Sequence, residues 1–350
     1  MKHLLHAHHP FRIFVISALI TLVALAWVGI NLGPAALLIA TILIIVEVTF
    51  SFDNAIINAK VLHTMSRFWQ TLFITVGIFI AVFGMRLVFP IVIVMITANL
   101  SAGDVLNLAI NQPDEYSKRI TDSHVMIASF GGMFLLMLFT HFFFNRNKTV
   151  HWLTSIEKPL QKISKWWTHG IVSLIVLLAI TFMPGNDRPL DVFIPGIAGL
   201  LTYLVVHGLA DLFARKQELT SKEKGVLIER TGMAGFMSFL YLEVLDASFS
   251  FDSVIGAFAI TKDIVLIAIG LGIGALWVRS LTIFMVRKKV LHAYKYLEHG
   301  AHYTIGFLAF VLLSSVFIHL PEAVAGLTGI IIIGLSIMGS MKDVRRQNQT

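Results

Sequence analysis

The composition of the chain is typical of a protein embedded in a lipid bilayer. It has 350 residues, of which 57% are hydrophobic and 13% are charged, and its mean hydropathy is +0.82. Because soluble proteins carry about a quarter of charged residues, the composition excludes a soluble enzyme. The chain has no cysteine, so a metal would have to be held by oxygen or imidazole ligands.

The net charge of +7 does not indicate a nucleic-acid partner. The Lys and Arg residues fall in short clusters between long apolar runs, as they do in the cytoplasmic loops of membrane proteins. We therefore expect the lipid bilayer as the partner and no binding to nucleic acid.

Apolar stretches predict an all-α fold, a polytopic transmembrane bundle of about ten helices. A helix of about 20 apolar residues crosses the hydrocarbon core. The predicted spans lie near residues 13–32, 34–60, 69–98, 124–144, 170–183, 191–213, 231–261, 263–286, 300–319 and 322–340.

The basic residues predict the orientation of these spans. With alternating loops, 21 of the 27 Lys and Arg fall on one side, four on the other, and Arg86 and Arg279 within spans. The richer side is cytoplasmic, so we expect a multi-pass protein of the plasma (cell inner) membrane with both termini in the cytoplasm. Residues 24–26 imitate a signal-peptidase site, but the apolar run continues to Leu32, which favours a retained anchor.

Two segments allow alternative interpretations. Residues 146–169 alternate basic residues with Trp152, Trp166 and Trp167, which suits either a helix in the headgroup layer or a cytoplasmic loop with aromatic anchors. The N-terminal histidines have the residue type to chelate a metal, but a tail without a specific role is favoured. They are His3, His6, His8 and His9.

An internal repeat is the most informative feature of the sequence. Residues 47–54 read Glu-Val-Thr-Phe-Ser-Phe-Asp-Asn and residues 246–253 read Asp-Ala-Ser-Phe-Ser-Phe-Asp-Ser. Each copy is followed by a ten-residue segment that begins with glycine and ends with arginine, residues 77–86 and 270–279. Two matches in the same order indicate a duplication.

The two copies lie five predicted spans apart, so they cross the membrane in opposite directions. This predicts the inverted-topology repeat of secondary transporters, whose substrate site lies at the repeat interface near the midplane. We expect one integral membrane domain in two halves. Residues 1–168 hold motif 47–54, the first four helices and the interfacial segment, and residues 169–350 hold motif 243–253 and the last six helices.

Acidic residues within the membrane are the candidate site. Acids at the bilayer centre cost roughly 2.5–3.5 kcal/mol each on insertion scales, and they are usually functional. Arg86 and Arg279 are candidate charge partners, which leaves an excess of acids to bind a cation, protons or both. The alternative is that the acids only join helices through ion pairs. The five acids are Glu47, Asp53, Glu243, Asp246 and Asp252.

Helical spacing aligns oxygen-bearing side chains on each copy. Glu47, Ser51, Asn54 and Asn58 share one stripe, and the second copy has a matching stripe. That stripe contains Glu243, Asp246, Ser250 and Ser253. The motif aspartates fall off these stripes in both copies, so either each faces a third helix or the helix is locally unwound beside it.

The ligand types favour a hard or borderline divalent cation. Carboxylate, amide and hydroxyl oxygens suit Mn²⁺, Ca²⁺ and Mg²⁺ better than Zn²⁺ or Cu⁺. No nucleophile-elbow, zinc-protease or phosphate-loop motif occurs, so we expect no enzymatic activity and no tightly bound cofactor.

The motifs resemble the two signatures of the TerC family of integral membrane proteins. The resemblance lies in residues 47–55 and 243–253 and in the two segments that end in arginine. It implies transport of a divalent metal, especially manganese export, and an association with tellurium resistance. Two departures are the extra spans between the repeats and Ile255 in place of a common proline. The metal-ligand positions that the resemblance implies are Glu47, Asp53, Asn54, Glu243, Asp246, Asp252 and Ser253.

The leading hypothesis is a transporter that moves Mn²⁺ outward by alternating access between the repeats, with protons as the candidate counter-ion. Ca²⁺ and Mg²⁺ are the other candidate ions. The alternative is a non-transporting membrane component of a metal or tellurite stress-resistance complex. An anion or amino-acid exporter fits the acidic helices poorly.

Overall fold

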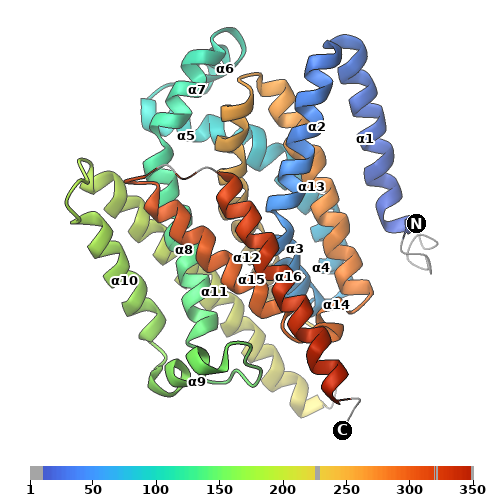
Figure 1. Cartoon of the computed structure of the whole chain (residues 1–350), viewed down its shortest axis with the longest axis vertical. Helices are drawn as coiled ribbons and strands as arrows, with labels where there is room; N and C mark the ends of the chain where they lie inside the picture. Colours follow the sequence, from blue (N-terminus) through green and yellow to red (C-terminus); the bar gives the residue numbers. More distant parts are fainter. Residues whose placement is uncertain (1–10, 225–228, 319, 321, 348–350) are drawn as a thin grey trace. The chain divides into compact units, whose positions relative to one another are not determined.

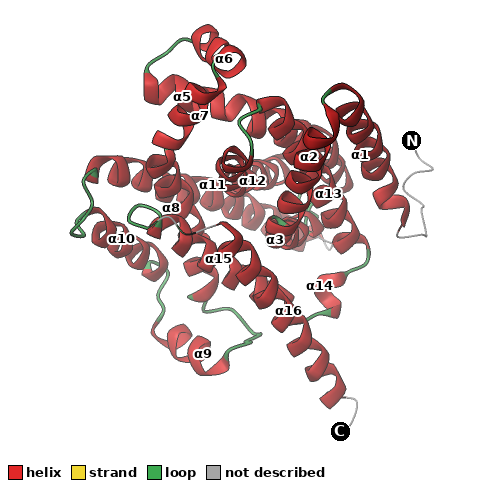
Figure 2. Ribbon diagram, turned by 45° about the horizontal axis from the view of Figure 1, so that its top comes forward, coloured by secondary structure: helices red, strands yellow, loops and turns green. Residues whose placement is uncertain are grey.

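The computed structural model describes the chain except residues 1–10, 225–228, 319, 321 and 348–350. The N-terminal histidine cluster therefore lies outside the described residues. The described part consists of helices and connecting loops, without a strand (Figure 2). This confirms the all-α prediction.

Seven helices of the described chain are long and apolar enough to cross a membrane. An eighth span results if the helix pair Thr154–Ile163 and Thr168–Thr181, bent by 102°, counts as one. The sequence predicts about ten spans, so the structure supports fewer by length and apolar character alone. The seven are Ile13–Asn31, Gly33–Phe50, Arg67–Ala98, His124–Phe143, Pro189–Leu219, Ile264–Arg287 and Val324–Arg345.

The chain divides into two compact units, each built from two stretches of sequence. Unit 1 comprises Met1–Ser123 and Leu242–Lys289, and unit 2 comprises His124–Tyr241 and Val290–Thr350. Each unit thus draws on both of the halves expected from the sequence. Both copies of the repeated motif belong to unit 1.

Unit 1 is arranged around α13, which packs against α1, α2, α3 and η3. The chain between α4 and α5 is π-helical in η2 and η3, a widened geometry that often marks functional sites. The elements of unit 1 are labelled in Figure 1: α1 (Phe11–Asn31), α2 (Gly33–Phe50), α3 (Phe52–His63), α4 (Arg67–Leu72), η2 (Phe73–Gly77), η3 (Ile80–Val88), α5 (Phe89–Ala98), α6 (Ala102–Asn111), α7 (Pro113–Asp122), the part of α12 (Gly232–Ile260) from Leu242, and α13 (Ile264–Arg287).

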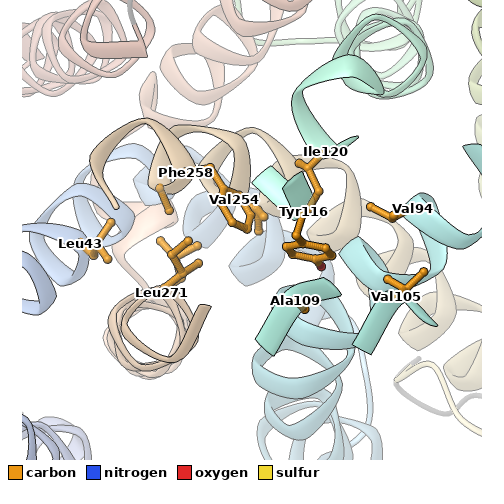
Figure 3. Packing of buried hydrophobic residues seen from close by; sticks show 11 residues of the cluster. Leu43, Val94, Val105, Ala109, Tyr116, Ile120, Val254, Phe258 and Leu271 are labelled. Atoms are coloured by element: carbon orange, nitrogen blue, oxygen red, sulfur yellow. The ribbon is translucent and has the colours of Figure 1, made fainter. Parts of the chain in front are cut away.

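One hydrophobic cluster of unit 1 joins α12 to the short helices α6 and α7 (Figure 3). Val254 and Phe258 of α12 lie between Leu271 of α13 and Tyr116 of α7. The rings of Tyr116 and Phe258 meet edge to face with centroids 5.8 Å apart. This contact holds the second motif helix against residues that follow the first motif in sequence.

Unit 2 is arranged around α8, which packs against α10, α11 and α15, while α16 packs on α15. The short helix α9 crosses below α10 in Figure 1, consistent with the sharp bend between them. The elements of unit 2 are α8 (His124–Phe143), α9 (Thr154–Ile163), α10 (Thr168–Thr181), α11 (Pro189–Lys224), the start of α12, α14 (Val290–Ala293), α15 (Leu297–Ser314) and α16 (Glu322–Gln347).

The close packing of α13 on α2 generates a stability prediction. A Cβ atom added at Gly270 would lie 2.5 Å from the Cβ of Leu43, which is fixed to the backbone of α2. We expect Gly270→Ala to lower the stability by about 1–3 kcal/mol through overpacking. Gly208→Ala is the control, because its added Cβ meets nothing within 4 Å. It should match the parent or gain up to about 1 kcal/mol in helix propensity.

The measurement is thermal unfolding of the purified protein in detergent. A Gly270→Ala variant that melts at or above the parent temperature would show that α13 does not contact α2 as described.

Candidate functional site

Glu47 near the end of α2 and Arg86 near the end of η3 form a buried ion pair. Arg86 Nη2 lies 2.5 Å from Glu47 Oε1, and the side chains are 3% and 1% exposed, respectively. Ser51 Oγ donates to the same carboxylate oxygen at 3.1 Å. Arg86 also donates to the carbonyls of Ala81 at 2.5 Å and Leu271 at 3.1 Å. The guanidinium is thus held by one charge and two backbone oxygens.

Arg279 on α13 forms the corresponding pair with Asp246 on α12. Its Nη2 lies 3.0 Å from Asp246 Oδ2 and 3.6 Å from Glu243 Oε1, and it donates to the Gly77 carbonyl at 3.3 Å. The guanidinium carbon lies 3.7 Å from the centre of the Phe73 ring. One arginine therefore serves two acids and an aromatic face.

The contacts of the two arginines follow one pattern. Each pairs with the acid that opens the motif of its own copy, and each donates to a backbone carbonyl in the glycine-to-arginine segment of the other copy. A third contact joins the copies directly, because Asn54 Nδ2 donates to Asp246 Oδ1 at 2.6 Å. The repeated residues thus form one network inside unit 1.

The first motif helix is interrupted at Ser51. This residue separates α2 from α3 with φ −98° and ψ 16°. The backbone N–H of Asn54 donates to Asp53 Oδ1 at 2.9 Å, and Asp53 is buried at the start of α3. The departure is confined to this residue, because the N–H of Ser51 still donates to the Glu47 carbonyl at 3.0 Å and the N–H of Ala55 donates to the Ser51 carbonyl at 3.2 Å.

The second motif helix has no such interruption. Residues 246–253 lie within α12, which is helical throughout Gly232–Ile260. Ser253 is buried, whereas the side chain of Asp252 lies outside the described part of the structure. The two copies therefore differ in backbone geometry, although each arginine pairs with the first acid of its motif and donates to a carbonyl of the other copy.

Several buried polar atoms of this network have no hydrogen-bond partner. On the first copy they include Glu47 Oε2, Asn54 Oδ1 and both polar atoms of Asn58. On the second copy they are both carboxylate oxygens of Glu243 and Nη1 of Arg279. A buried acceptor without a donor is costly, so the network has capacity for a proton, a water molecule or a cation.

Four of the predicted ligands form two groups, one at each arginine. Among the described side chains, no group of three or more His, Asp and Glu is placed to hold a metal ion. Glu47 belongs to the Arg86 group, and Asn54, Glu243 and Asp246 belong to the Arg279 group. In each group, an arginine nitrogen lies beside the carboxylate that was predicted to bind the metal.

Sequence reasoning missed residues that have no charge of their own. Phe73 lies against Arg279, and a Cβ added at Gly77 would lie 2.5 Å from Glu243 Oε1. A Cβ added at Gly274 would lie 2.5 Å from Glu47 Cβ. The position of Gly77 at the start of a repeated segment could have indicated its role. No feature of the sequence indicated a role for Phe73 or Gly274.

The fold and the site define a class: a helical membrane protein with paired charges buried among its helices. A family model described as "Protein of unknown function (DUF475)" matches residues 52–347, so the chain belongs to this family. The matched range contains both arginines and begins just after Glu47 and Ser51. No curated protein and no solved structure matches the chain.

The buried ion pair generates a second stability prediction. Arg86→Gln leaves Glu47 buried without its cation, so we expect a loss of about 3–5 kcal/mol. The double variant Arg86→Gln/Glu47→Gln removes both charges and should be more stable than the single variant. Thermal unfolding in detergent measures both.

The control is the ion pair of Lys262 and Asp114, whose side chains are 59% and 81% exposed. Lys262→Gln should change the stability by less than about 1 kcal/mol, because exposed pairs contribute little. Equal losses for Arg86→Gln and Lys262→Gln would contradict the buried pairing.

Proposed function

We propose that this protein transports a divalent cation, with Mn²⁺ favoured, outward across the plasma membrane in exchange for protons. The observation that carries the proposal is the set of buried oxygens without a hydrogen-bond partner beside the two arginine–acid pairs, including Glu47 Oε2, Asn54 Oδ1 and both oxygens of Glu243. Oxygen atoms of this kind are the ligands that Mn²⁺, Ca²⁺ and Mg²⁺ prefer. The resemblance of the motifs to the TerC family supports the choice of manganese.

An inverted repeat is part of the proposal. The reciprocal donation of Arg86 to Leu271 and of Arg279 to Gly77 is the pattern expected of two equivalent copies that face each other. The remaining two of ten spans would be α12 and α15, of 29 and 18 residues, which carry polar side chains. Ten spans would place both termini on the same side, which the distribution of Lys and Arg predicts to be cytoplasmic.

The arginines suggest how an empty carrier avoids uncompensated charge. With no cation bound, Arg86 neutralises Glu47, and Arg279 neutralises Asp246. A divalent cation would bind the acids that the arginines leave unpaired, in exchange for the protons on them. The network then holds positive charge beside its acids in the loaded and in the empty state, so either state can reorient across a medium of low dielectric constant.

The different backbones of the two copies support alternating access. In a carrier made of inverted repeats, exchanging the conformations of the copies exchanges the side that is open. Here the first copy is broken at Ser51 and the second is continuous. The proposed cycle would exchange these two geometries between α2–α3 and α12.

Uptake of ⁵⁴Mn²⁺ into proteoliposomes with an imposed pH gradient tests the proposal. We expect Asp53→Asn and Glu243→Gln to reduce the initial rate of uptake about 10- to 100-fold, the range seen when groups that support a metal ligand are removed. Asp252→Asn should behave like Asp53→Asn if the copies are equivalent. The control is Asp114→Asn, which removes an exposed carboxylate of unit 1 and should keep the parent rate.

The outcomes separate the two candidate functions. Folded Asp53→Asn and Glu243→Gln variants that move Mn²⁺ at the parent rate would disprove the site. A parent protein that moves no divalent ion under any pH gradient would favour the alternative, a non-transporting component of a metal or tellurite stress-resistance complex. That alternative is supported by the lack of a preformed metal cluster among the described side chains.

A further inference from the structure

Unit 2 contains a basic cavity that the proposed transport site does not use. It has a volume of about 620 Å³ and lies where α8 ends and α10 begins. Its wall includes residues 144–147 after α8, residues 165–167 before α10, and Arg215 of α11. This volume is within the range of about 300–1,000 Å³ that small-molecule sites occupy.

Three cations line the cavity and are weakly compensated. Arg146 and Lys165 form no ion pair with any acid in the part of the chain that the structure describes, and Lys165 Nζ lies 5.4 Å from the centre of a Trp167 ring. Arg215 lies 3.7 Å from Asp211, and both side chains are largely exposed, so this pair is weak. The cavity therefore has a net positive charge and attracts an anion.

Aromatic and backbone groups of the wall complement this charge. His141 and His169 line the cavity with stacked rings, centroids 4.8 Å apart, and His141 Nδ1 lies 2.7 Å from Tyr203 Oη. Helix α10 begins at Thr168, between two residues of the wall, and the N-terminal end of a helix favours a bound anion. The site thus offers both charge and hydrogen-bond donors.

The surroundings of the cavity have the features of a membrane interface. Trp166 in its wall is 85% exposed, and α9 exposes Ile156 and Ile163, seven residues apart on one face. Exposed tryptophan beside an amphipathic helix is typical of the headgroup layer. Beyond the cavity, α10 exposes Ile171 and Ile175 on one face, an apolar surface suited to acyl chains.

We infer that this cavity binds the phosphate-bearing headgroup of an anionic phospholipid, with Arg146, Lys165 and Arg215 as the cationic ligands. A soluble phosphate has the same headgroup chemistry, but it would leave the exposed tryptophan and the apolar face of α10 without a role. The neighbouring Lys148 is not part of the site, because its Nζ lies 2.8 Å from Glu157 Oε2.

Native mass spectrometry of the full chain in detergent tests this inference, because it counts lipids bound to single molecules. Phosphatidylglycerol and phosphatidylcholine are titrated as probes. We expect the parent to prefer phosphatidylglycerol, and Arg146→Gln/Lys165→Gln to weaken its binding about 30-fold, as for the loss of two basic contacts with an anionic lipid. The matched control is Lys158→Gln/Lys162→Gln, which removes two exposed lysines of α9 outside the cavity and should stay within about threefold of the parent.

Other results would overturn the inference. Equal losses in the two double variants would mean that only overall charge matters. Equal binding of the two lipids by the parent would exclude recognition of the anionic headgroup. Displacement of phosphatidylglycerol by millimolar inorganic phosphate would assign the cavity to a soluble anion. A circular dichroism melt confirms that each variant is folded before it is titrated.

Discussion

The cost of placing charge among apolar helices determines the arrangement of unit 1. Neither Glu47 nor Arg86 is stable alone in a medium of low dielectric constant, so each requires the other within contact distance. The same holds for Asp246 and Arg279. These two requirements fix the register of α2 against η3 and of α12 against α13, and the surrounding apolar contacts must accommodate that register.

Small residues allow this register. Glu47 lies directly against Gly274, and Glu243 lies against Gly77, where a larger side chain would collide with the acid. Gly270 gives Leu43 the same close approach one turn away. The helices of unit 1 can therefore approach closely where the charges need short distances, and glycine supplies the room that the ion pairs require.

The sequence predicts those features that depend on large local energies. Long apolar runs gave the all-helical membrane fold, and the scarcity of buried charge singled out the acids and the two arginines that now pair. The displacement of Asp53 from its stripe predicted either contact with a third helix or local unwinding, and the backbone departs from helical geometry nearby, at Ser51. In each case a few neighbouring residues carry the signal.

Features that depend on packing between distant segments could not be read in this way. The two motifs share Phe-Ser-Phe-Asp, and this shared sequence does not distinguish the first copy, interrupted at Ser51, from the continuous α12. Each unit consists of two separate stretches of sequence. This division depends on which helices pack together, and amino-acid composition does not encode that choice. The same applies to Phe73, whose place under Arg279 follows from the path of η2.

The π-helical winding of η3 gives the two arginines unequal mechanical settings. A π-helical turn contains about one residue more than an α-helical turn, so a return to α geometry would rotate everything beyond it by about 100°. Arg86 stands in the last turn of η3, whereas Arg279 stands in the regular α13. A change in winding alone would thus swing Arg86 away from Glu47 without breaking the helix, while Arg279 could leave Asp246 only if the helix or its side chain moved.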